Sequence, residues 1–140
     1  MTKREAGETR LSHLPVRPDW LERRTEAAID PSLPIVDPHH HLWDREAERY
    51  LLDDLLRDIG EGHDVRATVF VQCGAMYRAT GPEEERSLGE TEFVNGIAAA
   101  SASGTYGPVR ACAGIVGFVD LTLGDRVAPL FGVGDRGVLV

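Results

Sequence analysis

Three apolar segments alternate with two amphipathic segments along this chain, and that order is the feature that most constrains its fold. The apolar segments have the length of strands and cover residues 34–37, 65–74 and 111–121. The second is β-branched and almost continuously apolar toward its end, which is typical of a strand buried on both faces. Alternating strands and helices predict parallel βα units with right-handed crossovers, and therefore an α/β fold.

Two helices are expected between the three strands. In residues 44–62 apolar side chains recur at helical spacing, at Leu52, Leu55, Leu56 and Ile59. Gly60 is well placed to end that helix. In the second helix Ser87 and Glu90 have the spacing of a capping box. Its apolar face would consist of Phe93, Val94, Ile97 and Ala98. A shorter helix with Asp19 as its N-cap is expected in the polar lead-in.

The composition fits one globular domain. With 140 residues, 42% of them hydrophobic, the chain is long enough to bury a core. Its net charge of −8 makes nucleic acid and anionic membranes poor partners. Neither a signal peptide nor a membrane-spanning stretch is evident, and Cys73 and Cys112 form no paired motif. A cytoplasmic protein with reduced, small, buried thiols is therefore predicted.

Three consecutive histidines stand in the segment IVDPHHHLWD, residues 35–44, at the end of the first predicted strand. Side chains alternate between the faces of a strand, so Asp37, His39 and His41 share one face. Two histidines two residues apart can direct their ring nitrogens to one point, which is half of a metal site, because a catalytic zinc needs about three protein ligands. On spacing alone, a run of surface histidines in a loop fits as well. His40 points the other way and is expected to pack or to form a hydrogen bond.

The segment PIVDPHHHLWD resembles the D-x-H-x-H signature of the amidohydrolase superfamily, and more closely the amidohydrolase-related branch of lactonase-like, predicted metal-dependent hydrolases. Four further segments resemble the next parts of that family, in order: YLLDDLLRDI, ATVFVQCGAMYR, GETEFVNGIAA and CAGIVGFVDLTLG. The resemblance implies that the chain is the N-terminal portion of a (β/α)8 TIM barrel with about three βα units present.

The same resemblance implies a hydrolase, in which activated water attacks the carbonyl of a lactone, ester or amide of a small-molecule substrate. His39 and His41 match the two signature histidines and would bind a divalent metal, with zinc favoured. Asp37 matches the signature aspartate and is interpreted as structural. Some lactonases of this branch act without a tightly held metal, and in that case the histidines would contact the substrate.

Gln72 is the candidate substrate-binding residue, because it ends the second predicted strand and could face the site. A structural hydrogen bond at the strand end is the alternative for this side chain. No catalytic residue is identified in the chain, because the family's general-base aspartate comes from the last strand of the barrel.

The chain is predicted to divide into three parts: a lead-in over residues 1–33, a partial amidohydrolase-related barrel domain over 34–129, and a divergent tail over 130–140 of the kind that an out-of-frame ending produces. The tail contains a G-x-G-x-x-G pattern but lacks the helix that a nucleotide site needs after it. A truncated barrel would be inactive alone and would expose strand edges, so self-association is expected. The alternative function is a non-catalytic metal-binding or interaction fragment.

Overall fold

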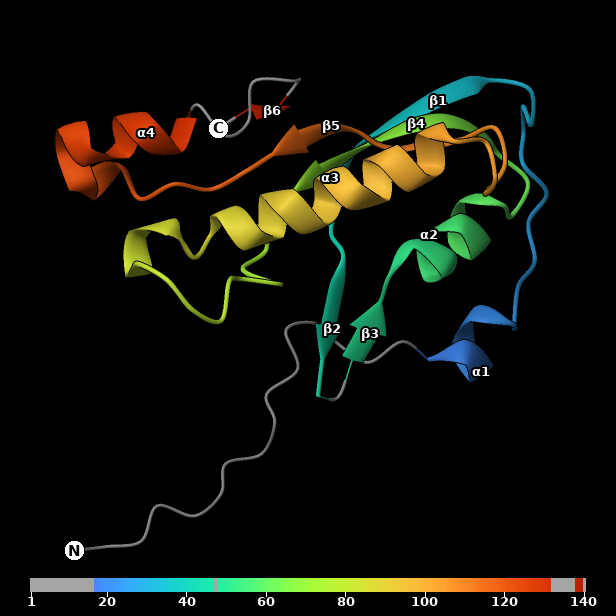
Figure 1. Cartoon of the computed structure of the whole chain (residues 1–140). Coiled ribbons are helices and arrows are strands. Elements are labelled where there is room, and N and C mark those ends of the chain that lie inside the picture. Colours follow the sequence, from blue (N-terminus) through green and yellow to red (C-terminus); the bar gives the residue numbers. More distant parts are fainter. Residues whose placement is uncertain (1–16, 47, 132–137, 140) are drawn as a thin grey trace, which may run out of the picture.

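A parallel sheet forms the centre of the molecule in the computed structural model (Figure 1). The structure describes residues 17–46, 48–131 and 138–139. Neighbouring strands of the sheet are parallel, and their spatial order follows the chain: β1 (Pro34–His40), β4 (Asp64–Val71), β5 (Arg110–Val116) and β6 (Val138–Leu139). The three apolar segments predicted as strands therefore form β1, β4 and β5.

A two-stranded antiparallel ribbon, separate from the main sheet, follows β1 in the chain. It consists of β2 (Trp43–Arg45) and β3 (Glu48–Tyr50). Trp43 lies opposite Tyr50 with the ring centroids 6.1 Å apart, and Asp44 lies opposite Arg49. Such aromatic and opposite-charge pairs stabilise antiparallel strands. They explain why this segment does not join the helix that was predicted to include it.

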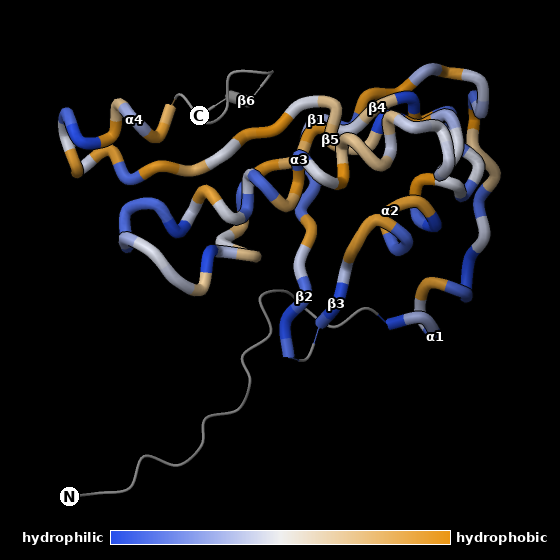
Figure 2. Tube along the Cα trace, viewed as in Figure 1, coloured by the Kyte–Doolittle hydropathy of each residue, from blue (hydrophilic) through white to orange (hydrophobic). Residues whose placement is uncertain are grey.

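Two helices lie along one face of the main sheet. α2 (Leu52–Ile59) ends at Gly60, as predicted, and α3 (Leu88–Ala102) is the longest helix described. Their apolar side chains meet those of the strands in a buried cluster, which Figure 2 shows as hydrophobic segments facing one another. The cluster consists of Leu42, Leu52, Leu55, Phe70, Val94, Ala111, Cys112 and Ile115.

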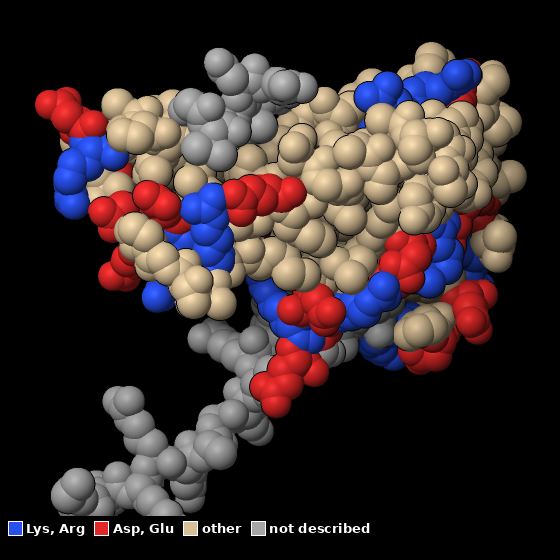
Figure 3. Space-filling model, viewed as in Figure 1, with Lys and Arg blue, Asp and Glu red and all other residues tan. Residues whose placement is uncertain are grey.

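The outer surface of α2 and the ribbon carries charges of both signs (Figure 3). Arg49 forms ion pairs with Asp53 and Asp54, and Arg57 forms another with Asp54. The backbone N–H of Leu51 donates to Asp54 at 3.0 Å and so satisfies a free donor at the helix start. This network stabilises the start of α2.

The lead-in and the C-terminal region form short elements. α1 (Pro18–Leu21) starts after Arg17 with proline in its first turn, so the predicted N-cap at Asp19 is wrong by two positions. After β5 come the 3₁₀ segment η2 (Leu121–Val127) and α4 (Ala128–Phe131). Leu88, Val119 and Leu130 form a second, smaller apolar cluster. The glycines of the G-x-G-x-x-G pattern lie outside the described residues.

The prediction that the chain forms the N-terminal portion of a TIM barrel is wrong, although its α/β character is confirmed. The parallel sheet is open, with three strands of seven or eight residues and the short β6, and the separate ribbon interrupts the first βα unit. A barrel closes only when enough tilted and staggered strands bring its two edges together. The described strands form a small open sheet covered by α2 and α3.

Candidate metal site at the end of β1

His39 and His41 come together at the carboxyl end of β1. Their Nε2 atoms lie 3.2 Å apart, and the two rings stand almost perpendicular, at 88°. His39 is exposed and His41 is half-buried, so solvent reaches the pair. The alternation of side chains predicted that these two rings share one face, and the structure brings their nitrogens to one point.

A carbonyl group of the neighbouring strand orients the His41 ring. Nδ1 of His41 lies 2.7 Å from the backbone oxygen of Val71, the last residue of β4. A carbonyl oxygen only accepts hydrogen bonds, so Nδ1 carries the proton and donates it. In neutral His41 the Nε2 atom therefore holds a free lone pair, which is the arrangement found in metal-binding histidines.

Asp37 positions the backbone of His39. Its Oδ1 atom accepts a hydrogen bond of 3.0 Å from the N–H of His39, two residues on. This is the local bond that aspartate readily makes to nearby backbone. Asp37 thus acts on the chain conformation at the site, in line with the structural role predicted for it.

The distance between the two Nε2 atoms matches the separation expected for two of the ligands of a tetrahedral zinc ion. At a Zn–N distance of about 2.0–2.1 Å, tetrahedral geometry places two ligand nitrogens about 3.3 Å apart. The observed 3.2 Å separation agrees with this value. It also agrees with a direct hydrogen bond from His39 Nε2–H to the free Nε2 of His41. In the described part of the chain no group of three or more His, Cys, Asp or Glu residues could hold a metal ion.

His40 lies on the opposite face and is only 8% exposed. Its Nε2 atom is 2.9 Å from Oγ1 of Thr68, and that oxygen also accepts the backbone N–H of Cys112 at 3.0 Å. Within the described part of the chain, Nε2 is the ring nitrogen of His40 that forms a hydrogen bond, whereas Nδ1 is buried and has no partner there. Burial lowers the pKa of His40, which favours the neutral ring. His40 joins β1 to β4 and β5 in the core, as the packing role predicted for it requires.

Gln72 directly follows β4, the strand that pairs with β1 and its histidines. Its backbone N–H donates to the carbonyl of Val116 at 2.9 Å and continues the pairing of β4 with β5. Its side chain is half-buried. The predicted role of Gln72 in substrate binding stays a prediction.

Trp43 and Arg45 flank the histidine pair on the ribbon. The Trp43 ring lies 6.2 Å from that of His41, and the guanidinium of Arg45 lies 5.3 Å from the Trp43 ring centroid. Arg45 also donates to the backbone oxygen of Cys73 at 3.0 Å. The ribbon is thus tied to the loop after β4 and places an aromatic wall beside the site.

Glu90 is an important residue at this edge of the sheet that the sequence did not reveal. It is 2% exposed, and its Oε1 atom accepts the backbone N–H groups of Cys73 at 3.0 Å and Ala75 at 2.9 Å. The predicted capping box is wrong, because Ser87 makes no side-chain cap and Glu90 binds the loop after β4 instead. Burial, and next the charge of Glu90, raise the pKa of the Cys73 thiol to about 11.

Gly89 allows the loop after β4 to approach α3 this closely. A Cβ atom at Gly89 would lie 2.5 Å from the backbone nitrogen of Arg78 and 2.6 Å from the backbone oxygen of Met76. The N–H of Arg78 also donates to the carbonyl of Arg86 at 2.9 Å. The segment GETEF contains both the glycine and the glutamate, but nothing in its spacing indicates which loop they hold.

Comparisons of the chain with protein-family models, with curated proteins and with solved structures find no match. The resemblance to the amidohydrolase-related family therefore stays a prediction that rests on the quoted segments. In the described part of the chain, no helix has the length and apolar character needed to cross a membrane.

Proposed function

We propose that this chain binds a divalent transition metal, zinc in the first instance, through Nε2 of His39 and Nε2 of His41. The observation that carries the proposal is the 3.2 Å separation of these two atoms, with the His41 ring held by the Val71 carbonyl. A metal bound there would act as a Lewis acid that polarises a carbonyl group and activates water.

We further propose that the metal serves hydrolysis of a lactone, ester or amide carbonyl, in keeping with the resemblance of residues 34–44 to the family signature. In this function His39 and His41 hold the metal, Asp37 positions the backbone of His39, and Gln72 contacts the substrate. Two ligands are fewer than the three that catalytic zinc ordinarily has. We therefore expect the 140-residue chain to bind metal without turnover by itself.

A second candidate function is metal binding without catalysis. It is favoured because the described residues offer two converging histidines and no third ligand beside them. In this function a second molecule, such as another copy of the chain, would complete the coordination of the metal. This candidate agrees with the self-association predicted from the strand edges.

The test is calorimetric titration of the full chain with zinc chloride near neutral pH. We expect one saturable site in the wild type and its loss in the double variant His39→Ala with His41→Ala. His63→Ala is the matched control, because His63 is exposed in the turn before β4 and should leave zinc binding unchanged. Equal binding by the wild type and the double variant would mean that the two rings form only a hydrogen bond, and would overturn the proposal.

Two further measurements separate the candidate functions. The zinc-loaded chain is assayed with an aromatic lactone and with p-nitrophenyl acetate, and its mass is measured by light scattering with and without zinc. Turnover that disappears in the double variant supports hydrolysis by this chain. Zinc-dependent dimerisation without turnover supports the metal-binding function with a shared site.

A further inference from the structure

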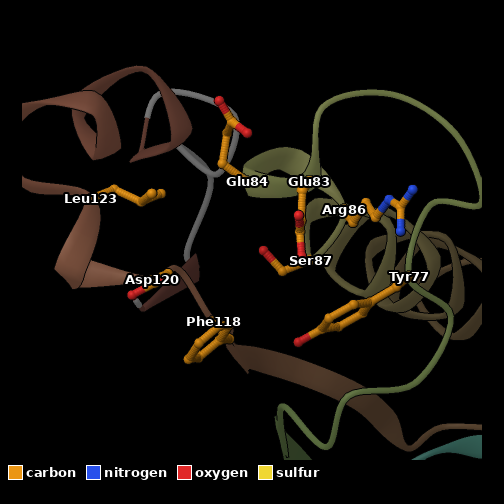
Figure 4. A pocket seen from close by; sticks show the side chains of 8 residues that line it. All are labelled: Tyr77, Glu83, Glu84, Arg86, Ser87, Phe118, Asp120 and Leu123. Atoms are coloured by element: carbon orange, nitrogen blue, oxygen red, sulfur yellow. The ribbon is translucent and has the colours of Figure 1, made fainter.

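A cavity of about 430 Å³ opens beside the start of α3, between the loop after β4 and the segment after β5. Figure 4 shows the hydroxyl groups of Tyr77 and Ser87 and the ring of Phe118 directed toward one shared space. Its volume lies in the range of small-molecule sites. The histidine pair does not line this cavity, so it is separate from the proposed metal site.

Ser87 is the residue that most directly indicates a ligand. Its side chain is only 7% exposed, it makes no cap to α3, and its hydroxyl forms no hydrogen bond within the described part of the chain. The Ser87 oxygen is not among the fully buried side-chain atoms that lack a partner, so it faces the open space of the cavity. Because the hydroxyl points into the cavity, a polar group of a bound molecule could form a hydrogen bond with it.

The cavity lining carries an excess of negative charge. Glu83, Glu84 and Asp120 contribute carboxylates, and neither glutamate forms an ion pair in the residues that the structure describes. Hydrogen bonds from Thr122 lower the pKa of Asp120, so this group is ionised at neutral pH. Arg86 also lines the cavity, but Figure 4 shows its guanidinium directed away from the Ser87 hydroxyl.

We propose that this cavity binds a small organic cation, a primary ammonium group on an apolar body about as large as one aromatic ring. An ammonium group has three donors and no acceptor, which matches the oxygens of Ser87, Tyr77 and Glu83. The Tyr77 and Phe118 rings offer faces that attract a cation and apolar surface for its body. Leu123 adds to that apolar surface.

The probe for the test is 2-phenylethylamine, titrated into the full chain near neutral pH and followed by ¹H–¹⁵N NMR. We expect saturable binding that shifts the amide signals of Ser87 and Phe118. The neutral isostere 2-phenylethanol and the anion phenylacetate should bind at least about tenfold more weakly, because each lacks the charge-assisted hydrogen bonds. Equal binding of all three compounds, or no saturable binding of the amine up to about 10 mM, would overturn the proposal.

Variants separate this cavity from general attraction to an acidic protein. Glu83→Gln and Ser87→Ala should each weaken amine binding by about five- to tenfold. Glu61→Gln removes the same charge in the turn between α2 and β4 and should leave the affinity unchanged. Ser87→Ala should also keep the unfolding midpoint, because the hydroxyl has no partner to lose. If Glu61→Gln weakens binding as much as Glu83→Gln, the attraction is unspecific and the proposed site is refuted.

The amine site and the metal site are tested independently. The double variant of His39 and His41 should lose zinc binding and keep amine binding, whereas Glu83→Gln should show the reverse. A loss of both in either variant would indicate misfolding, which the unfolding midpoint of the same sample detects.

Discussion

The histidine pair and the buried carboxylate of Glu90 both lie where strands of the main sheet end, and they are built in opposite ways. His39 and Asp37 interact over two residues of chain, and His39 is exposed, although the His41 ring also contacts the Val71 carbonyl of the neighbouring strand. Glu90 is buried, and its partners Cys73 and Ala75 are 17 and 15 residues away. The first group is available to a ligand, and the second holds a loop in place.

This difference indicates which substitutions should destabilise the fold and which should affect ligand binding. An exposed side chain can be replaced at little cost in stability, because water compensates for its lost contacts. A buried acceptor cannot, because its removal leaves buried donors without any partner. We therefore expect changes at Glu90 to act on folding and changes at the histidines to act on binding.

The largest effect is expected for Glu90→Ala. It leaves the N–H groups of Cys73 and Ala75 without an acceptor and should lower the free energy of unfolding by about 3–4 kcal/mol, measured by urea denaturation. Glu92→Ala is the matched control on the same helix, where an exposed ion pair with Arg78 is lost, and its effect should be much smaller. Equal effects of the two substitutions would show that Glu90 does not hold the loop.

Gly89→Ala should lower the free energy of unfolding by about 2–3 kcal/mol, because its Cβ would overlap the backbone of Met76 and Arg78 and force the loop away from α3. Gly96→Ala is the control in the same helix, since a Cβ there meets nothing within 4 Å. That change should raise the free energy of unfolding by about 0.5–1 kcal/mol through helix propensity. Destabilisation at both positions would contradict the close approach at Gly89.

The Cys73 thiol reports on the buried carboxylate. Its pKa is raised from 9.0 to about 11, so at pH 8 it should react with iodoacetamide about a hundredfold more slowly than an ordinary thiol. Since the raised pKa favours the protonated folded form, its contribution to stability is complete below pH 9.0 and is lost as the pH rises toward about 11. Peptide mapping by mass spectrometry measures the rate at this site. Rapid alkylation of the folded chain at pH 8 would contradict the burial of this thiol.

The smallest effect is expected at Asp37. Asp37→Ala removes the acceptor for the His39 N–H and should weaken zinc binding by about threefold without changing the unfolding midpoint. Asp37→Asn keeps an oxygen acceptor and should restore the affinity, as calorimetry would show. If the asparagine variant binds zinc as weakly as the alanine variant, the charge of Asp37 matters more than its hydrogen bond.

The sequence by itself determined the elements whose causes are local. The β-branched run of β4, the leucines of α2 with Gly60 at its end, and the shared face of His39 and His41 all depend on residues only a few positions apart. Periodicity therefore predicted the α/β class, two main helices and a shared face for His39 and His41, while a run of surface histidines fitted the spacing equally well.

Only the tertiary structure decided how these elements combine. Pairing of Trp43 with Tyr50 made a ribbon from residues that the predicted helix had included, and the strands form a small open sheet where the N-terminal portion of a barrel was predicted. The same is true of Glu90, which spacing suggested as a helix cap and which instead binds a loop far away in sequence. Burial and pairing across such distances depend on which surfaces meet, and no local period contains that information.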